Sequence, residues 1–425
     1  MRIGVNRSSL SNWFGGVFHY ESIFTDALGQ IAKNFPEEIV YLSYQPDDII
    51  SLANAGEIKY RGLTIQPLYA PLQIPKQEPP EFYFAGRQPV ARPPLDLNTF
   101  TPDTAAESAF RSAGIDFLLL LSPFLQAFSL RLPFIMPIFD LNHKLQPEFP
   151  EVSSFGEINI RDHMYVNTCR YATFILVDSD VGKADVLRFY GDYIDEDRIR
   201  VLPYYPPNER KALPTPNDLT RVRAKYSLPA RYFFYPAQFW RHKNHELIIR
   251  AVRAIADSTG EVVPVVFCGS YADYHRALNF KKLETLTKEL GITDRVGYLG
   301  FVPEEDMAAL YAMSVGLVMP TFFGPTNIPP LEAWHYGRPV ITSDIRGVRE
   351  QIGDAGLLVN PRSETDLADA MLKLWRDEAL CVELTKRGQR HLSSYGWDDY
   401  VKRIAAIIAE ACDRVRTGNT PVYPK

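Results

Sequence analysis

Short apolar runs alternate with amphipathic segments along almost the whole chain. The runs are rich in Val, Ile, Leu and Phe, which is typical of strands that are buried on both faces. In the first half they are residues 2–5, 39–44, 117–122, 134–140, 173–179 and 198–205, and in the second half 232–237, 264–269, 296–301, 315–320, 339–344 and 356–361. Segments with helical spacing separate most of them, for example 244–258, 303–313 and 363–376. This alternation predicts parallel sheets covered by helices on both faces.

Two proline-rich stretches interrupt the alternation. Residues 71–94 read as a long loop inside the first half, and residues 204–218 are polar and fall between two complete blocks. We place an interdomain hinge at the second stretch. The prediction is an α/β protein of two Rossmann-like domains in series, residues 1–205 and 206–397, followed by a helix over about 398–416 whose apolar residues share one face.

Composition narrows the class of protein. The 425 residues are 46% hydrophobic and 23% charged, with a net charge of −5. The sequence has no dense basic block, which disfavours a nucleic-acid partner. The first residues, MRIGVNRSS, lack the apolar core of a secretory signal. The apolar run 117–121 is far shorter than the roughly 20 residues of a membrane span. Four cysteines lie far apart, without metal or redox spacing. We therefore expect a reduced, cytoplasmic location.

A candidate anion site follows the run 315–320. A loop leads to a helix expected to begin at Pro329, with Glu332 in its first turn. The N–H groups around Asn327 and Ile328, together with the helix dipole, favour an anion such as a diphosphate. Glu332 is suited to accept hydrogen bonds from ribose hydroxyls. The alternative is a capped helix whose glutamate faces solvent.

A second basic group lies at another predicted strand end. The stretch QFWRHKNH, residues 238–245, follows the run 232–237 and opens a helix. Arg241 and Lys243 are suited to pair with phosphate oxygens there. Taken alone, the stretch also fits a solvated basic turn.

Together these motifs, with CGS at 268–270 and GYLGFVPEEDMAALYAMS at 297–314, resemble the nucleotide-binding half of family 4 glycosyltransferases of the GT-B fold. The resemblance covers the whole C-terminal half. It implies that Lys243 binds the diphosphate of a nucleotide sugar and that Glu332 binds its ribose. It further implies a cradle of loop amides and a base contact, from Thr326, Asn327, Ile328, Phe301 and Val302.

The chain departs from the family at two positions. The family commonly has a glutamate where this chain has Gly324, and an arginine where it has Gln238. The missing glutamate normally lies near the transferred sugar, which leaves that sugar and its orientation open. Arg241 is a candidate replacement for the lost positive charge. Loops of the form FGPTN occur as a variant within the family, so the departure does not imply an inactive protein.

The acceptor side is expected in the first half. Gly15 and Gly16 follow the first strand and open a helix, and by the resemblance this loop faces the donor phosphates. Asp140 closes an apolar run, and His143 lies three residues further on, while Phe139 occupies the family's usual histidine position. His143 either contacts a sugar hydroxyl in the cleft or is satisfied by Asp140 within a turn.

Two other polar segments each allow two interpretations of their role. Arg161 points either into the cleft or to a surface ion pair. The tripeptide Asp178–Ser179–Asp180 resembles a metal-binding motif, but it ends a strand and begins a helix, so we interpret Asp180 as a helix cap. No metal cluster is expected, and GT-B enzymes use cationic side chains and helix dipoles instead.

The predicted function is retaining transfer of a hexose from a GDP- or UDP-linked donor to a glycan or lipid-linked acceptor, in polysaccharide or glycolipid assembly. Asp140, His143, Lys243 and Arg241 are the catalytic candidates, and no cofactor or metal is expected. Closure about the 204–218 hinge would exclude water, and by the resemblance the last helix returns to the first domain. Peripheral contact with the inner face of a membrane and the oligomeric state stay open. The alternatives are a non-catalytic nucleotide-sugar-binding protein and a nucleotide-sugar epimerase.

Overall fold

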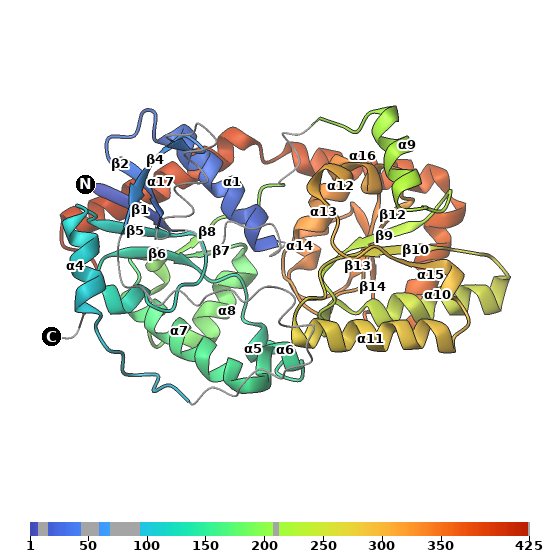
Figure 1. Cartoon of the computed structure of the whole chain (residues 1–425), viewed down its shortest axis with the longest axis horizontal. Coiled ribbons are helices and arrows are strands. Elements are labelled where there is room, and N and C mark those ends of the chain that lie inside the picture. The colour runs from blue at the N-terminus through green and yellow to red at the C-terminus, as the bar shows by residue number, and fades with distance from the viewer. Residues whose placement is uncertain (7–15, 44–58, 69–93, 207–211, 424–425) are drawn as a thin grey trace.

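The computed structural model describes residues 1–6, 16–43, 59–68, 94–206 and 212–423. Figure 1 shows two lobes, each built on its own sheet and covered by helices on both faces. Within this described part of the chain, no helix has both the length and the apolar character needed to cross a membrane.

The first lobe contains an eight-stranded sheet. Its strands are β1 (Arg2–Asn6), β2 (Glu38–Ser43), β3 (Lys59–Tyr60), β4 (Leu63–Pro67), β5 (Phe117–Leu120), β6 (Phe134–Pro137), β7 (Phe174–Val177) and β8 (Ile199–Val201). They lie in the order β3-β4-β2-β1-β5-β6-β7-β8, and all neighbours are parallel except β3 and β4. The α-helices of this lobe are α1 (Gly16–Ile31), α4 (Thr104–Ser112), α5 (Asn142–Leu145), α6 (Pro150–Ser153), α7 (Glu157–Tyr171) and α8 (Asp180–Tyr190).

The second lobe contains a six-stranded, fully parallel sheet. Its strands are β9 (Phe233–Pro236), β10 (Val265–Cys268), β11 (Val296–Tyr298), β12 (Gly316–Met319), β13 (Val340–Ser343) and β14 (Gly356–Val359), in the order β11-β10-β9-β12-β13-β14. Its α-helices are α9 (Pro216–Lys225), α10 (His245–Thr259), α11 (Tyr274–Glu289), α12 (Glu304–Met313), α13 (Ile328–His335), α14 (Val348–Ile352), α15 (Glu364–Arg376) and α16 (Glu378–Ser393).

Burial explains why these segments form strands and helices. Every residue of β5, β6, β7, β10 and β12 is buried, as expected for the inner strands of a sheet covered on both faces. Helix α10 buries Leu247, Ile248, Val252 and Ile255 along one side, and it ends at Gly260, whose φ of 74° suits glycine.

The chain returns to the first lobe at its C-terminal end. Helix α17 (Trp397–Arg416), red in Figure 1, contacts α1 and buries Tyr400, Ile404 and Ile408 in the same apolar cluster as β1. The indole N–H of Trp397 donates to Gln30 Oε1 at 2.8 Å where the helix begins.

The predicted fold class is confirmed, since every predicted apolar run contains a strand. Strands β3 and β4 were not predicted, because β4 mixes polar and apolar residues and joins the edge of the sheet. Two helix starts differ from the prediction. Helix α13 begins at Ile328, so Glu332 lies in its second turn, and Ser179, not Asp180, caps α8 by accepting the Gly182 N–H. The predicted hinge connects the two sheets, although residues 207–211 and most of the 71–94 loop lie outside the described residues.

Candidate active site

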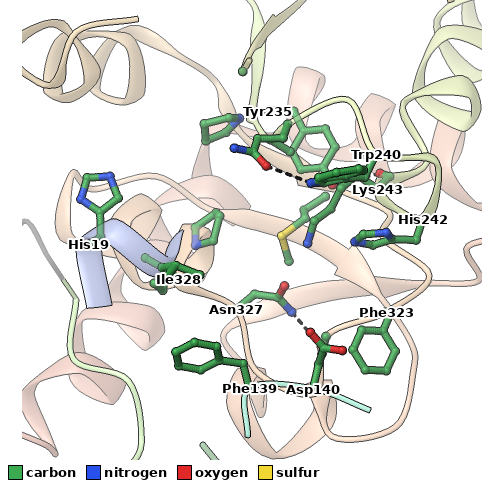
Figure 2. Close-up of a pocket in the computed structure, with 18 of the residues that line it drawn as sticks. His19, Phe139, Asp140, Tyr235, Trp240, His242, Lys243, Phe323, Asn327 and Ile328 are labelled. Atoms are coloured by element: carbon green, nitrogen blue, oxygen red, sulfur yellow. Dashed lines mark hydrogen bonds between the residues drawn. The ribbon is translucent and has the colours of Figure 1, made fainter. Parts of the chain in front are cut away.

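A pocket of about 520 Å³ lies between the lobes, at the carboxyl ends of strands from both sheets. Ligands of open α/β sheets bind at this edge, where strands end and helices begin. Figure 2 shows Lys243 and Trp240 on one side of the pocket and Asp140 and Phe139 on the other. We call the side formed by the second lobe the donor wall and the side formed by the first lobe the acceptor wall.

Lys243 is fixed on the donor wall by its neighbours. It ends a short 3₁₀ helix after β9, and its backbone carbonyl accepts the Tyr235 hydroxyl at 2.9 Å. The next residue, Asn244, adopts a left-handed conformation, and its amide donates to Pro320 O at 2.8 Å and to Pro361 O at 2.9 Å. Three strand ends are thereby tied together beneath the lysine.

The electrostatic surroundings of the Lys243 ammonium group are unusual. None of the described residues forms an ion pair with it, although it lines the pocket. Burial lowers the pKa of Lys243 to about 8, and the negative charges of Asp140 and Glu151 oppose that shift only in part. A half-buried cation without an ion-pair partner gains from an anionic ligand.

The start of α13 offers fewer amides than expected. The Asn327 N–H donates to Gln351 Oε1 at 2.9 Å, and the Gln351 amide donates back to Asn327 O at 2.6 Å. Pro329 and Pro330 have no N–H. Ile328 is thus the first-turn residue whose amide is left to a ligand, while Thr326 directs its hydroxyl to Asp178 of the first lobe. Asn327 does not donate its amide in this arrangement, because Gln351 takes it.

Gly324 is required by the local packing. Its φ is 122°, and a Cβ atom there would lie 2.6 Å from Asn327 Oδ1. The Asn327 amide occupies this space and donates to Gly324 O at 2.8 Å. A glutamate at this position would therefore have a strained backbone and would displace the Asn327 amide. At the other departure, Gln238 Oε1 accepts the Trp240 indole N–H at 2.8 Å, and both residues line the pocket.

Glu332 lies in the donor wall. Its side chain is buried, and Oε2 accepts the Tyr311 hydroxyl at 2.7 Å. Tyr311 thereby orients the carboxylate of Glu332. Phe301 and Val302 line the same pocket, with Phe301 partly exposed at its rim.

The acceptor wall carries Asp140 and Arg161. The Arg161 guanidinium donates to Asp140 Oδ1 at 3.2 Å, and the Asn142 N–H donates to the same oxygen at 3.0 Å. Burial alone would raise the pKa of Asp140, but Arg161 and Asn142, with His143 and His242 nearby, hold it below its usual value. Asp140 is thus an anion at neutral pH, in a position to accept a hydrogen bond from a hydroxyl.

The walls are joined by contacts across the pocket. Glu151 Oε1, on α6, accepts the backbone N–H of His242 at 2.9 Å and its Nδ1–H at 2.8 Å. Gln146 donates its amide to Phe322 O at 2.8 Å. These bonds attach the loop that follows β6 to the loops that follow β9 and β12.

Some predicted residues lie elsewhere. His143 is buried below the acceptor wall, where Nε2 lies 3.0 Å from the Tyr190 hydroxyl and 3.2 Å from Asp162. It does not line the pocket, and its partner is Asp162, not Asp140. Arg241 is exposed and does not line it either. Gly16 starts α1, whose first turns contribute Val17, His19 and Tyr20 to the pocket, whereas Gly15 lies outside the described residues.

Glu151 and His242 were missed in the sequence. His242 adjoins Lys243 in the quoted stretch, but nothing in the sequence showed that it would bond a residue 91 positions away. In the described part of the chain, no three His, Cys, Asp or Glu side chains are grouped as a metal site would require.

Two lobes of this kind, with a nucleotide-sized pocket between them, define the GT-B fold. Residues 220–391 match the family model described as Glycosyl transferases group 1. Solved structures agree on the fold. Sucrose-phosphate synthase from Thermosynechococcus elongatus superposes with a TM-score of 0.68 at 18% identity, covering 96% of this chain and 98% of that chain. Anabaena HepE in complex with UDP-glucose gives 0.66 at 15% identity, covering 96% and 99%.

Curated relatives are glycosyltransferases of low identity. O-antigen chain mannosyltransferase B of Escherichia coli is 27% identical over 232 residues, which are 54% of this chain and 58% of that protein. A D-inositol 3-phosphate glycosyltransferase of Corynebacterium urealyticum is 25% identical over 243 residues, 56% of each chain. The chain thus spans little more than half the length of the curated relatives it matches. The match to the family model lies in its C-terminal half, at residues 220–391.

Proposed function

We propose that the protein transfers a hexose, with retention of configuration, from a nucleoside diphosphate sugar to a hydroxyl of a glycan or lipid-linked acceptor. The observation that carries the proposal is Lys243, a half-buried cation without an ion-pair partner among the described residues, in the same pocket as Glu332. A nucleoside diphosphate offers the matching groups, an anion for the lysine and ribose hydroxyls for the glutamate.

The reaction places most negative charge on the leaving diphosphate as its bond to the sugar breaks. Lys243 and the Ile328 amide are suited to stabilise that charge, and the low polarity of the pocket strengthens their effect. Asp140, fixed by Arg161, is suited to orient the acceptor hydroxyl. The bonds that join the two walls reduce access of water, which would otherwise hydrolyse the donor.

The relatives support the type of donor. One is named as a mannosyltransferase, and one structural neighbour was solved with UDP-glucose. GDP-mannose and UDP-glucose are therefore the first donors to test. Polysaccharide or glycolipid assembly, without a metal and at the inner face of a membrane, is the setting that we propose.

Titration calorimetry with GDP and UDP, with and without EDTA, tests the donor site in wild type, Lys243→Ala and Glu332→Ala. We expect metal-independent binding of one nucleotide that both variants weaken. Failure of both nucleotides to bind the folded wild type would overturn the proposal. Binding without transfer to a broad acceptor panel would instead identify a non-catalytic nucleotide-sugar-binding protein.

A further inference from the structure

The two carboxylate oxygens of Glu151 have different surroundings. Oε1 accepts both hydrogen bonds from His242, at 2.9 and 2.8 Å. Oε2 is buried and has no hydrogen-bond partner among the described residues. The whole side chain is only 3% exposed, yet it belongs to the lining of the pocket. An unsatisfied carboxylate oxygen thus belongs to a residue that lines the pocket.

This carboxylate is charged. Burial alone would raise the pKa of Glu151, but the hydrogen bonds from His242 outweigh burial and lower it. Burial, in turn, lowers the pKa of His242, so the imidazole is neutral at pH 7 and its Nδ1 carries the proton that it donates. A buried anionic oxygen without a donor is costly, and buried polar atoms almost always have a partner. Oε2 is therefore suited to a donor that the ligand brings.

The chemistry of the donor substrate indicates which group this is. A diphosphate carries only acceptor oxygens and would repel Glu151, and Lys243 already offers it a cation. A sugar hydroxyl is neutral and can donate a proton to the carboxylate. The transferred sugar is attached directly to the diphosphate, so it occupies the part of the pocket next to Lys243.

The residue at position 324 supplies no carboxylate that could bind a sugar hydroxyl. The loop from Thr321 to Gly324 is bonded to His242, whose carbonyl accepts the Phe322 N–H at 2.8 Å and the Thr321 hydroxyl at 3.2 Å. Gly324 has no side chain to offer, and Asn327 blocks one. Glu151 therefore brings a carboxylate from the opposite lobe to the pocket that this loop also lines.

We propose that Glu151 binds a hydroxyl of the transferred hexose through Oε2 and so determines which donor sugar is accepted. This inference rests on the proposed function. Because Glu151 lies on the first lobe and its partner His242 on the second, the sugar contact forms only when the two lobes are together.

Glu151→Gln tests the contact sharply. The glutamine oxygen can still accept from His242, but an amide N–H₂ then replaces Oε2 and cannot accept a hydroxyl proton. The matched control is Glu148→Gln, at an exposed position of the same segment that does not line the pocket. Calorimetry compares GDP with GDP-mannose and UDP with UDP-glucose, and transfer or donor hydrolysis is measured with the sugar that wild type uses.

We expect Glu151→Gln to bind the free nucleoside diphosphate like wild type and to lose ~10- to 100-fold in affinity and turnover for the nucleotide sugar, as for loss of a charged hydrogen bond. One monodeoxy analogue of that donor, the one that lacks the contacted hydroxyl, should bind wild type more weakly than the full donor by a similar factor. The Glu151→Gln variant should bind this analogue and the full donor with nearly equal affinity. Unchanged sugar affinity in the variant would overturn the contact. Equal losses for nucleotide and nucleotide sugar would also overturn it, since Glu151 would then act through His242 and Lys243. A wild type that binds no nucleotide would overturn the proposed function itself.

Discussion

The two walls of the pocket carry charged side chains of opposite sign, and these differ in whether the protein itself supplies a partner. On the donor wall, Lys243 has no ion-pair partner among the described residues. On the acceptor wall, Asp140 is paired with Arg161 at 3.2 Å, and Glu151 of the same lobe accepts two bonds from His242. The donor wall is therefore suited to an anionic ligand, whereas the acceptor wall carries the carboxylates of Asp140 and Glu151, which suit neutral hydroxyl donors. This contrast is what a transferase needs if it is to bind a charged donor next to an uncharged nucleophile.

Removing the unpaired charge should have the largest effect. Lys243→Ala should lower kcat by ~100- to 1000-fold, the range for loss of one group that stabilises developing charge. Nucleotide affinity should fall as well. Steady-state kinetics and calorimetry measure the two effects. Arg241→Ala is the matched control, because Arg241 is a neighbouring but exposed cation outside the pocket. If both variants lost activity equally, the loss would not be specific to the cation that lines the pocket, and the role assigned to Lys243 would be wrong.

Asp140→Asn addresses the opposite wall. It keeps the shape of the side chain but removes the charge that Arg161 and the Asn142 N–H compensate. We expect kcat/KM for the acceptor to fall by ~10- to 100-fold, as for loss of a charged hydrogen bond, while donor affinity changes little. Acceptor kinetics at saturating donor, combined with donor titration, separate the two. If the variant lost donor affinity instead, Asp140 would contact the donor and not the acceptor.

The pH dependence of donor binding tests the charge on Lys243 directly. Burial lowers the pKa of Lys243 to about 8, so the binding-competent cation is lost as the pH rises above that value. Affinity for a nucleotide sugar should be constant below about pH 7 and fall by up to about tenfold per pH unit well above 8, with uptake of one proton on binding.

Lys243→Arg supplies the control for this profile, because a guanidinium stays charged throughout the range. The variant should bind more weakly at pH 7, since its planar group differs in shape, but its affinity should not decline above pH 8. Calorimetry in buffers of different ionisation enthalpy counts the protons. A wild-type profile that stayed flat to pH 10 would mean that Lys243 carries no titrating contact with the donor.

The sequence indicated most of the donor wall but only part of the acceptor wall, where it singled out Asp140 and missed Glu151. Lys243 and Thr326 lie in the connections that follow β9 and β12, and Glu332 lies on α13, the helix after the second connection, so parallel strand order brings all three to one edge. Glu151 reaches the pocket only because α6 contacts the other lobe, which no local pattern encodes. Even on the donor wall, the amide of Asn327 was predicted to face a ligand, but Gln351, 24 residues away, takes it.

His143 shows why proximity in sequence is a weak guide on the acceptor wall. It lies three residues after Asp140, but the short helix α5 turns its ring inward to Asp162 and Tyr190. There, Lys144, His143 and the Tyr190 hydroxyl lower the pKa of Asp162 to about 2 against the effect of burial. The group is a compact polar cluster below the pocket, and its bonds are all made within the first lobe.

The smallest effect on activity should therefore come from His143. We expect His143→Ala to lower the free energy of unfolding by about 1–3 kcal/mol, because it leaves buried partners without their hydrogen bond. The folded variant should keep kcat within about threefold of wild type, as expected of a residue that does not touch substrate. Denaturant unfolding and kinetics at a temperature well below the transition measure the two quantities, with Tyr190→Phe as a second removal from the same cluster. If His143→Ala instead abolished transfer while stability was unchanged, His143 would act on the substrate, and the acceptor wall would extend below the pocket that the structure shows.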